Sequence, residues 1–354
     1  MKLLVLGGTD FLGARFVEAA LERGHSLTLF TRGRTKADRF GERVARLVGD
    51  RDPDVGAGLA ELADAVRRER YDAVVDISGY VPRHVQASAA LTAPGVDTYL
   101  YVSTVSVYAD PPVQGSDESA PLIRLDDPTV EEITAATYGG LKVLCEERVR
   151  AAAGDKTLIV RPGILGGRED FTERLTFWPW LARATRGGRM LAPGDGSDLT
   201  SVLDARDLAQ WMVELCERGA TATRAATGRD VFNTAGEPVT FRELIAAARA
   251  AVQVCDAGGC DPDQGGAPLP EVVWLALDEL ERAKIEPWSD LPMFAPPARQ
   301  GLFTVSSDAA VAAGLQRRPL VETCADALGA FTGEAPKAGL SLERAQAAVA
   351  ARQA

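Results

Sequence analysis

Tyr138 and Lys142 stand four residues apart in a stretch whose pattern predicts a helix, which places both side chains on one helix face. A tyrosine hydroxyl, whose pKa is near ~10, is a poor acid-base catalyst at neutral pH; a neighbouring ammonium group lowers that pKa and can also hold a nicotinamide ribose. Upstream, the hydroxyl-rich run YVSTVSVY ends a predicted strand, and Thr104 within it would orient a substrate oxygen toward Tyr138. These residues predict proton exchange at an oxygen atom during hydride transfer, with Ser103 and Ser106 as alternative hydroxyls.

The first residues, MKLLVLGGTDFLG, place a short apolar strand before a glycine cluster and an amphipathic helix. A pyrophosphate docks on backbone N–H groups at a helix N-terminus, and side chains in the turn would hold the backbone away from it. Gly7, Gly8 and Gly13 therefore predict a dinucleotide-binding turn. In G-x-G-x-x-G spacing the second glycine would fall at Asp10, whose carboxylate repels a pyrophosphate, so we expect it to point away or to bind a ribose hydroxyl.

The end of the second predicted strand decides between the two nicotinamide cofactors. An NAD-specific site offers an acidic residue to the ribose hydroxyls there, whereas a 2′-phosphate calls for Arg. The chain has Arg32 and Arg34 and no carboxylate at this point, which favours NADP(H) with both guanidinium groups on the phosphate. If the two arginines are only solvated surface residues, NAD(H) is the alternative. Asp50 and Arg51, after the third predicted strand, are placed to border the adenine.

Strand and helix patterns alternate through the first half of the chain, which predicts a Rossmann-type doubly wound α/β fold with a parallel sheet covered by helices. We place the NAD(P)-binding domain at 1–165, with returns to its sheet near 202–235. Frequent glycine and proline residues interrupt the later pattern and predict a smaller C-terminal substrate lobe at 166–201 and 236–335, which is interleaved in sequence with the first domain. We expect a helical tail at 336–354. The predicted strands are 3–6, 26–30, 44–48, 72–77, 98–103, 157–160, 202–207 and 231–233, and the predicted helices are 14–23, 59–68, 85–91 and 138–152.

Composition and charge narrow the class of protein. The chain of 354 residues carries a formal charge of −11, which disfavours a nucleic-acid surface, and no apolar run reaches the ~18 residues that a membrane span needs. The first residues lack a signal-peptide pattern, so we expect a cytoplasmic protein whose partner is a small-molecule substrate. Its five cysteines are mostly scattered, with Cys255 and Cys260 as a close pair, and the chain has only two histidines, so we expect no metal site.

The combination GGTDFLG, YVSTVSVY, YGGLK and RPG resembles the extended short-chain dehydrogenase/reductase family over the first 165 residues. Further stretches, among them TFWPWLARATRGGRMLAPG and LDARDLAQWMV, resemble its bacterial "NAD-dependent epimerase/dehydratase" branch, related to the chloroplast stem-loop-binding proteins. The resemblance implies Thr104, Tyr138 and Lys142 as the catalytic triad, and a homodimer, because many relatives pair. The cofactor-binding residues expected from the turn and the resemblance are Gly7, Gly8, Thr9, Asp10, Phe11, Leu12 and Gly13, with Asp50, Arg51, Ser78, Gly79, Pro162, Gly163 and Ile164.

The resemblance leaves the reaction open between alternatives. Family members that dehydrate nucleotide sugars follow the catalytic Thr with an Asp-Glu pair, and this chain has Val105 and Ser106 there, so we expect no 4,6-dehydratase. The leading hypothesis is an NADPH-dependent reductase acting on a carbonyl or alcohol of a sugar, nucleoside or other polyhydroxylated metabolite. The alternatives are an epimerase with retained NAD, and an RNA-binding or scaffold protein without catalysis. The residues expected to contact substrate are Tyr80, Ser106 and Trp178, although a tryptophan of this kind is usually a core residue.

Overall fold

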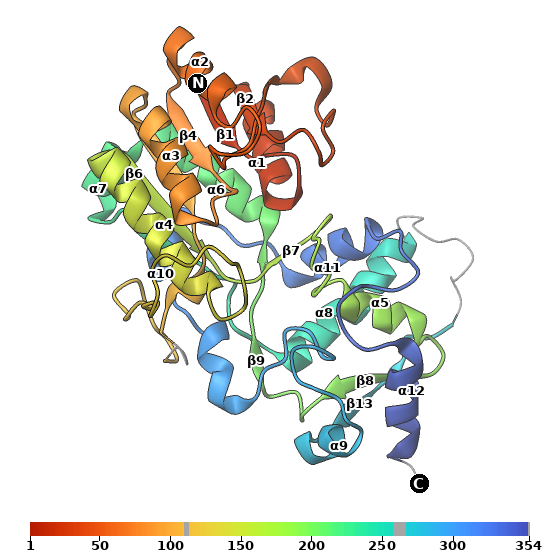
Figure 1. Ribbon diagram of the computed structural model, residues 1–354. Coiled ribbons are helices and arrows are strands. Elements are labelled where there is room, and N and C mark those ends of the chain that lie inside the picture. The colour runs from red at the N-terminus through yellow and green to blue at the C-terminus, as the bar shows by residue number, and fades with distance from the viewer. Residues whose placement is uncertain (110–112, 258–266, 353–354) are drawn as a thin grey trace.

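The computed structural model describes residues 1–109, 113–257 and 267–352, and these ranges contain a central parallel sheet of seven strands (Figure 1). The strand order is β11-β6-β5-β4-β1-β2-β3, so the order reverses between β1 and β4, as in a Rossmann-type doubly wound fold. The predicted fold class is therefore confirmed. The strands are β1 Lys2–Leu6, β2 Ser26–Thr31, β3 Ala45–Val48, β4 Ala73–Asp76, β5 Thr98–Val102, β6 Thr157–Pro162 and β11 Val231–Thr234.

Side chains of β1 alternate between two apolar layers, because successive residues of a strand point to opposite faces of the sheet. Leu3 and Val5 pack in the layer under α1 and α6, and Leu4 and Leu6 pack in the layer under α2, α3 and α4. All four side chains are completely buried, and burial of one such side chain contributes about 1.5–3 kcal/mol. The helices of this part are α1 Phe11–Glu22, α2 Ala60–Arg68, α3 Pro82–Thr92, α4 Tyr138–Ala153, α6 Ala205–Arg218, α7 Ala220–Thr227 and α10 Asp308–Ala312.

A second lobe has its own apolar core, in which Trp178, Phe241 and Phe294 pack edge to face. It is built mainly from residues after β6, and it lies below the sheet in Figure 1, with the C-terminal helix at its edge. Cys260 and the other lobe residues 258–266 lie outside the described ranges. The lobe elements are β7 Leu165–Gly166, α5 Phe177–Ala184, β8 Arg189–Pro193, β9 Leu199–Thr200, β10 Leu203–Asp204, β12 Val239–Thr240, α8 Phe241–Ala257, β13 Glu271–Leu275, α9 Leu277–Arg282, α11 Leu320–Gly329 and α12 Leu342–Ala351.

One predicted return to the main sheet is wrong. The segment 202–207 was expected to be a strand of that sheet, but only Leu203–Asp204 is extended, and it pairs with β7 in a separate two-stranded sheet. Asp204 ends the strand because its side chain accepts a hydrogen bond from the Arg206 backbone N–H and caps α6. The other predicted return is confirmed, since β11 pairs in parallel with β6 at the edge of the main sheet.

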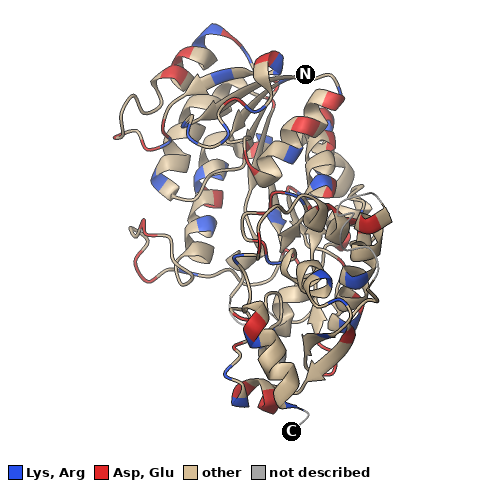
Figure 2. Cartoon of the chain, turned by 90° about the vertical axis from the view of Figure 1, so that its right-hand side faces the viewer, with Lys and Arg blue, Asp and Glu red and all other residues tan. Residues whose placement is uncertain are grey.

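Lys and Arg residues are interspersed with Asp and Glu residues along the helices of both parts, as the colours of Figure 2 show. Many of them form ion pairs across elements, for example Arg23 with Glu217 and Arg150 with Asp230. In the described ranges, no helix combines the length and the apolar character that crossing a membrane requires. No described group of three or more His, Cys, Asp or Glu side chains is arranged to hold a metal ion.

Candidate active site

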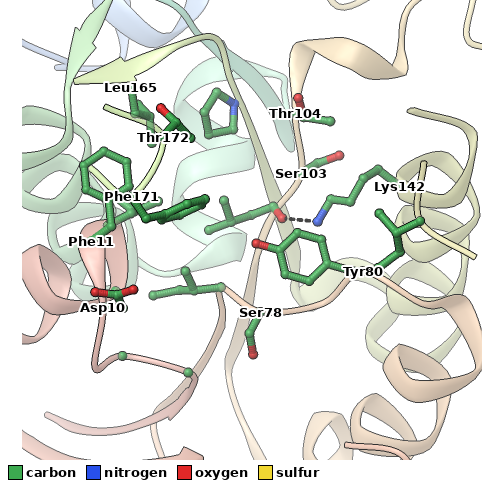
Figure 3. Close-up of a pocket in the computed structure, with 18 of the residues that line it drawn as sticks. Asp10, Phe11, Ser78, Tyr80, Ser103, Thr104, Lys142, Leu165, Phe171 and Thr172 are labelled. Carbon is green, nitrogen blue, oxygen red and sulfur yellow. Dashed lines mark hydrogen bonds between the residues drawn. The ribbon is translucent and has the colours of Figure 1, made fainter. Parts of the chain in front are cut away.

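A cavity of about 840 Å³ lies at the carboxyl ends of the central strands, where the strand order reverses, and the loop after β7 closes one side of it. Ligands of open α/β sheets bind at this switch point. Figure 3 shows Phe11 and Phe171 close together on one side of the cavity, and Tyr80, Lys142 and Thr104 across from them. The predicted residues that line it are Gly7, Gly8, Thr9, Asp10, Phe11, Leu12, Gly13, Arg32, Arg34, Asp50, Arg51, Ser78, Tyr80, Thr104, Ser106, Tyr138, Lys142, Pro162, Gly163 and Ile164.

The glycine turn between β1 and α1 has the shape of a phosphate cradle. Gly7 and Gly8 have φ values of +111° and +106°, a backbone conformation that L side chains rarely adopt. A Cβ atom at Gly13 would lie 2.8 Å from the Gly8 Cα atom, so only glycine lets α1 approach the turn this closely. The turn therefore leads directly into the N-terminus of α1, where backbone N–H groups and the helix dipole favour an anion. These features fit a dinucleotide pyrophosphate.

The Asp10 carboxylate, which replaces a glycine in this turn, has its charge compensated. The Lys36 ammonium donates a hydrogen bond to Asp10 Oδ1 at 2.8 Å and lies 3.2 Å from Glu169 Oε1. Glu169 also pairs with Arg39 and Arg15, at 2.5 Å and 3.1 Å. We call these five residues the ion-pair strap, because they connect the glycine turn and the β2–β3 loop to the loop after β7.

Arg32, Arg34 and Asp50 line the end of the cavity next to β2 and β3. Both arginines are exposed, and in the described ranges neither lies within ion-pair distance of a carboxylate. Arg51 differs from expectation: its guanidinium is turned inward, donating to both Asp76 carboxylate oxygens at 2.5 and 2.7 Å and to Ser88 Oγ at 2.7 Å. Burial opposes the Arg51 charge, but the attraction of Asp76 outweighs burial and raises the pKa of Arg51. The Arg51 side chain therefore joins Asp76 and Ser88 beneath the cavity. Asp50 lines the cavity itself.

Lys142 is buried beneath the cavity at the N-terminal part of α4. Its Nζ atom donates to the backbone oxygens of Gly79 and Val102, both at 2.7 Å, and lies 5.2 Å from the centre of the Tyr80 ring. Burial lowers the pKa of Lys142 to about 8, because removing an ammonium group from water disfavours its charged form. Gly79, expected to contact cofactor, does not line the cavity; its carbonyl positions Lys142 instead.

Tyr138 and Thr104 face the same cavity from α4 and from the end of β5. Thr104 Oγ1 accepts a hydrogen bond from the Ser106 backbone N–H at 3.1 Å and donates to Ser106 Oγ at 3.2 Å, which fixes its rotamer. Burial raises the pKa of Tyr138 to about 12, against a smaller opposing contribution from Thr104. The net pKa shift of Tyr138 is therefore upward and not downward as expected, because desolvation of the phenolate outweighs the favourable contributions of its neighbours. The hydroxyl is protonated at neutral pH.

Trp178 is not a substrate contact. Its side chain is completely buried in the second lobe, its indole N–H donates to the Pro292 backbone oxygen at 2.9 Å, and it does not line the cavity. The reason is that α5 turns its tryptophan face toward α8, where Trp178 packs against Phe241 with ring centres 5.0 Å apart. A large aromatic side chain in an amphipathic helix is more often core than ligand-binding.

The Ser103 hydroxyl, an alternative to Thr104 in the sequence prediction, is buried in the cavity lining without a hydrogen-bond partner in the described structure. Other lining residues were missed by sequence reasoning. The loop after β7 and two distant segments add a further wall. No local pattern marks these residues, because their loops have no periodicity. They are Ile133, Asp170, Phe171, Thr172, Arg174 and Leu302, and Trp288 lines the cavity with them.

Fold and site together define a Rossmann-type protein with the residues of a nicotinamide-dinucleotide site. The model of the NAD dependent epimerase/dehydratase family matches residues 3–226, and the chain belongs to this family. It is 32% identical over 269 residues to a 2-alkyl-3-oxoalkanoate reductase of Stenotrophomonas maltophilia, covering 71% of this chain and 76% of that protein. It is 25% identical over 311 residues to the chloroplast stem-loop binding protein of 41 kDa b of Arabidopsis thaliana, covering 83% and 71%.

Among solved structures, the NAD⁺ complex of the Bordetella bronchiseptica enzyme WbmH is similar, with a TM-score of 0.62 at 17% identity over 93% of this chain and 98% of that one. At this identity the likeness shows the fold. The family and the reductase relative assign the chain to the NAD(P)-binding oxidoreductases and epimerases.

Proposed function

We propose that the protein is an NADP(H)-dependent reductase that converts a ketone of a small metabolite to a secondary alcohol. The observation that carries the proposal is the protonated hydroxyl of Tyr138 in the cavity, with Thr104 beside it and the Lys142 ammonium beneath. Reduction of a carbonyl consumes one proton, and a tyrosine with a pKa of about 12 holds that proton throughout the neutral range.

Thr104, Tyr138 and Lys142 each have a separate role in the proposed reduction. With substrate bound, the Thr104 hydroxyl turns its proton from Ser106 Oγ to the carbonyl oxygen and holds that oxygen next to Tyr138. A nicotinamide dinucleotide held by the glycine turn would supply the hydride for the carbonyl carbon. As the C=O double bond becomes a C–O single bond, the Tyr138 hydroxyl transfers its proton to the oxygen, which leaves a phenolate. The positive charge of Lys142 stabilises that phenolate until water reprotonates it.

The reductase relative supports the direction of this proposal, because its name describes reduction of a 3-oxo group. The choice of NADP(H) rests on Arg32 and Arg34. Both are exposed at the cavity end next to β2, and both lack a carboxylate partner within the described ranges. Two guanidinium groups without internal partners fit a 2′-phosphate, for which charge-assisted forked hydrogen bonds are well suited.

Binding of the two cofactors tests the proposal. The absorbance spectrum of dialysed protein is recorded first, and NADPH and NADH are then titrated while tryptophan fluorescence is followed, since Trp288 lines the cavity. We expect no retained cofactor and tighter binding of NADPH. Arg32→Ala should weaken NADPH binding about 10- to 100-fold and leave NADH binding unchanged, because one charge-assisted contact contributes about 1.5–3 kcal/mol.

The matched control is Arg148→Ala, which removes the same charge from an exposed position of α4 outside the cavity. This variant should bind both cofactors as the wild type does. Retained NAD(H), or a preference for NADH, would contradict the reductase proposal and favour an epimerase that recycles its cofactor.

A further inference from the structure

The cavity has several apolar side chains in its lining besides the glycine turn. Phe171 is 60% exposed and Ile133 is 50% exposed, and both line the cavity together with Trp288 and Leu302. Trp288 has a φ of 69°, a backbone conformation that is unusual for a bulky residue. Exposed aromatic and aliphatic side chains in the lining of one cavity indicate a binding surface for an apolar part of a ligand.

Arg174 adds a positive charge to this part of the cavity lining. The Arg174 guanidinium lies 5.1 Å from the centre of the Trp288 ring, and in the described ranges no carboxylate lies within ion-pair distance of it. Asp170, on the same loop, is buried, and its carboxylate accepts hydrogen bonds from the Thr172 backbone N–H and hydroxyl. Arg174 therefore presents a positive charge to the cavity without an ion pair in the described ranges, although this charge partly offsets the burial that raises the pKa of Asp170.

This charge acts at the reaction centre. Arg174 is among the groups that lower the pKa of Tyr138, although burial outweighs them, so the guanidinium and the phenol interact through the cavity. Arg174 and Tyr138 line the same cavity, so a ligand that places its carbonyl oxygen at Tyr138 can extend toward Arg174. An anionic group a few bonds from the carbonyl would find its counter-charge there.

We propose that the substrate is a ketone that carries one carboxylate near the carbonyl and an alkyl or aryl chain, with Arg174 binding the carboxylate and Trp288 and Phe171 contacting the chain. The inference rests on the proposed reduction. A nucleotide diphosphate fits less well, because it carries at least two negative charges; of the arginines in the described lining, Arg32 and Arg34 lie at the cofactor end and Arg51 is paired with Asp76, which leaves Arg174. The apolar side chains also provide few partners for the hydroxyls of the polyhydroxylated substrate expected from the sequence.

A matched pair of ketones tests this inference. Freshly prepared 3-oxooctanoate and its methyl ester differ in charge but share the carbonyl and the alkyl chain, and NADPH oxidation gives kcat/KM for each. We expect the wild type to prefer the acid. Arg174→Gln should lower kcat/KM for the acid about 10- to 100-fold more than for the ester, because the charge-assisted contact is lost only with the acid, whereas any effect through Tyr138 is shared by both.

Arg174→Lys should restore part of the preference, since it keeps the charge and loses the planar fork. Arg148→Gln removes the same charge outside the cavity and should leave both values unchanged. A second measurement needs no turnover: binding of 3-hydroxyoctanoate to the NADPH complex, followed by calorimetry, should weaken in Arg174→Gln and not in Arg148→Gln.

The outcomes separate the two proposals. If NADPH binds and the ester is reduced as well as the acid in both wild type and Arg174→Gln, the carboxylate inference is wrong and the reductase proposal stands. If 3-hydroxyoctanoate binds with an affinity that does not depend on Arg174, the inference is wrong whatever the turnover. If NADPH does not bind, the reductase proposal itself fails.

Discussion

At the scale of single residues, the site contains two groups whose pKa values have moved apart. Burial lowers the pKa of Lys142 to about 8 and raises that of Tyr138 to about 12. Both shifts have one cause, since desolvation disfavours the charged ammonium and the charged phenolate alike. At neutral pH the pair is therefore a protonated acid above a cation, which suits donation of a proton to a developing alkoxide.

The pH dependence of reduction follows from these two values. As the pH rises, Lys142 loses its proton at about pH 8, long before Tyr138 loses its own, so the acid is present while its supporting charge disappears. We expect kcat/KM for ketone reduction to be level below about pH 7.5 and to fall above about pH 8. Steady-state rates over this range, with an ester substrate whose charge does not change, provide the measurement.

Two variants check the assignment. Lys142→Arg keeps a cation whose pKa is above ~12, so its profile should lose the fall near pH 8 even if the rate is lower throughout. Tyr138→Phe removes the acid and should lower kcat about 10²- to 10⁴-fold at every pH. A wild-type profile that stays level to pH 10 would show that Lys142 does not control the reaction.

At the scale of elements, the cradle depends on the close approach of α1 to the turn after β1. A Cβ at Gly13 would meet the Gly8 Cα and N atoms at 2.8 and 2.9 Å, and these are backbone atoms that cannot move aside. We expect Gly13→Ala to lower the free energy of unfolding by about 1–3 kcal/mol through overpacking and to weaken NADPH binding, as urea unfolding and fluorescence titration would measure.

Gly95→Ala is the matched control for this substitution. Gly95 lies in the turn after α3, its Cβ would meet nothing within 4 Å, and its φ is not positive. That variant should unfold at the same urea concentration as the wild type or slightly above it, because alanine restricts the unfolded chain. If both substitutions changed the free energy of unfolding equally, overpacking at Gly13 would not be the cause of the loss.

At the scale of the whole molecule, the ion-pair strap joins the loop after β7 to the dinucleotide half. Glu169 is its centre, with Lys36, Arg39 and Arg15 around it, and Phe171 packs on Phe11 next to it at 6.1 Å between ring centres. These contacts lie beside the glycine turn, so a bound cofactor would leave the cavity more easily once they are broken.

We expect Glu169→Gln to raise the dissociation rate of NADPH about 3- to 10-fold, since each partly exposed pair contributes only about 0.2–1 kcal/mol. Stopped-flow displacement of NADPH measures this rate, and the difference from the wild type should shrink in high salt. Glu22→Gln, at an exposed end of α1 outside the cavity, should dissociate as the wild type does. An unchanged rate in Glu169→Gln would mean that the strap does not retain the cofactor.

The doubly wound sheet, the glycine turn and the positions of Tyr138 and Lys142 can be predicted from the amino-acid sequence, because strand and helix periodicity, glycine spacing and an i, i+4 pair are local properties of the chain. Three features could not be predicted in this way: Trp178 is a core residue, Arg51 pairs with Asp76, and Arg174 lies against Trp288. These outcomes depend on packing between distant segments. The direction of the Tyr138 pKa shift belongs with them, since desolvation is a property of the folded surroundings and not of the spacing between two residues.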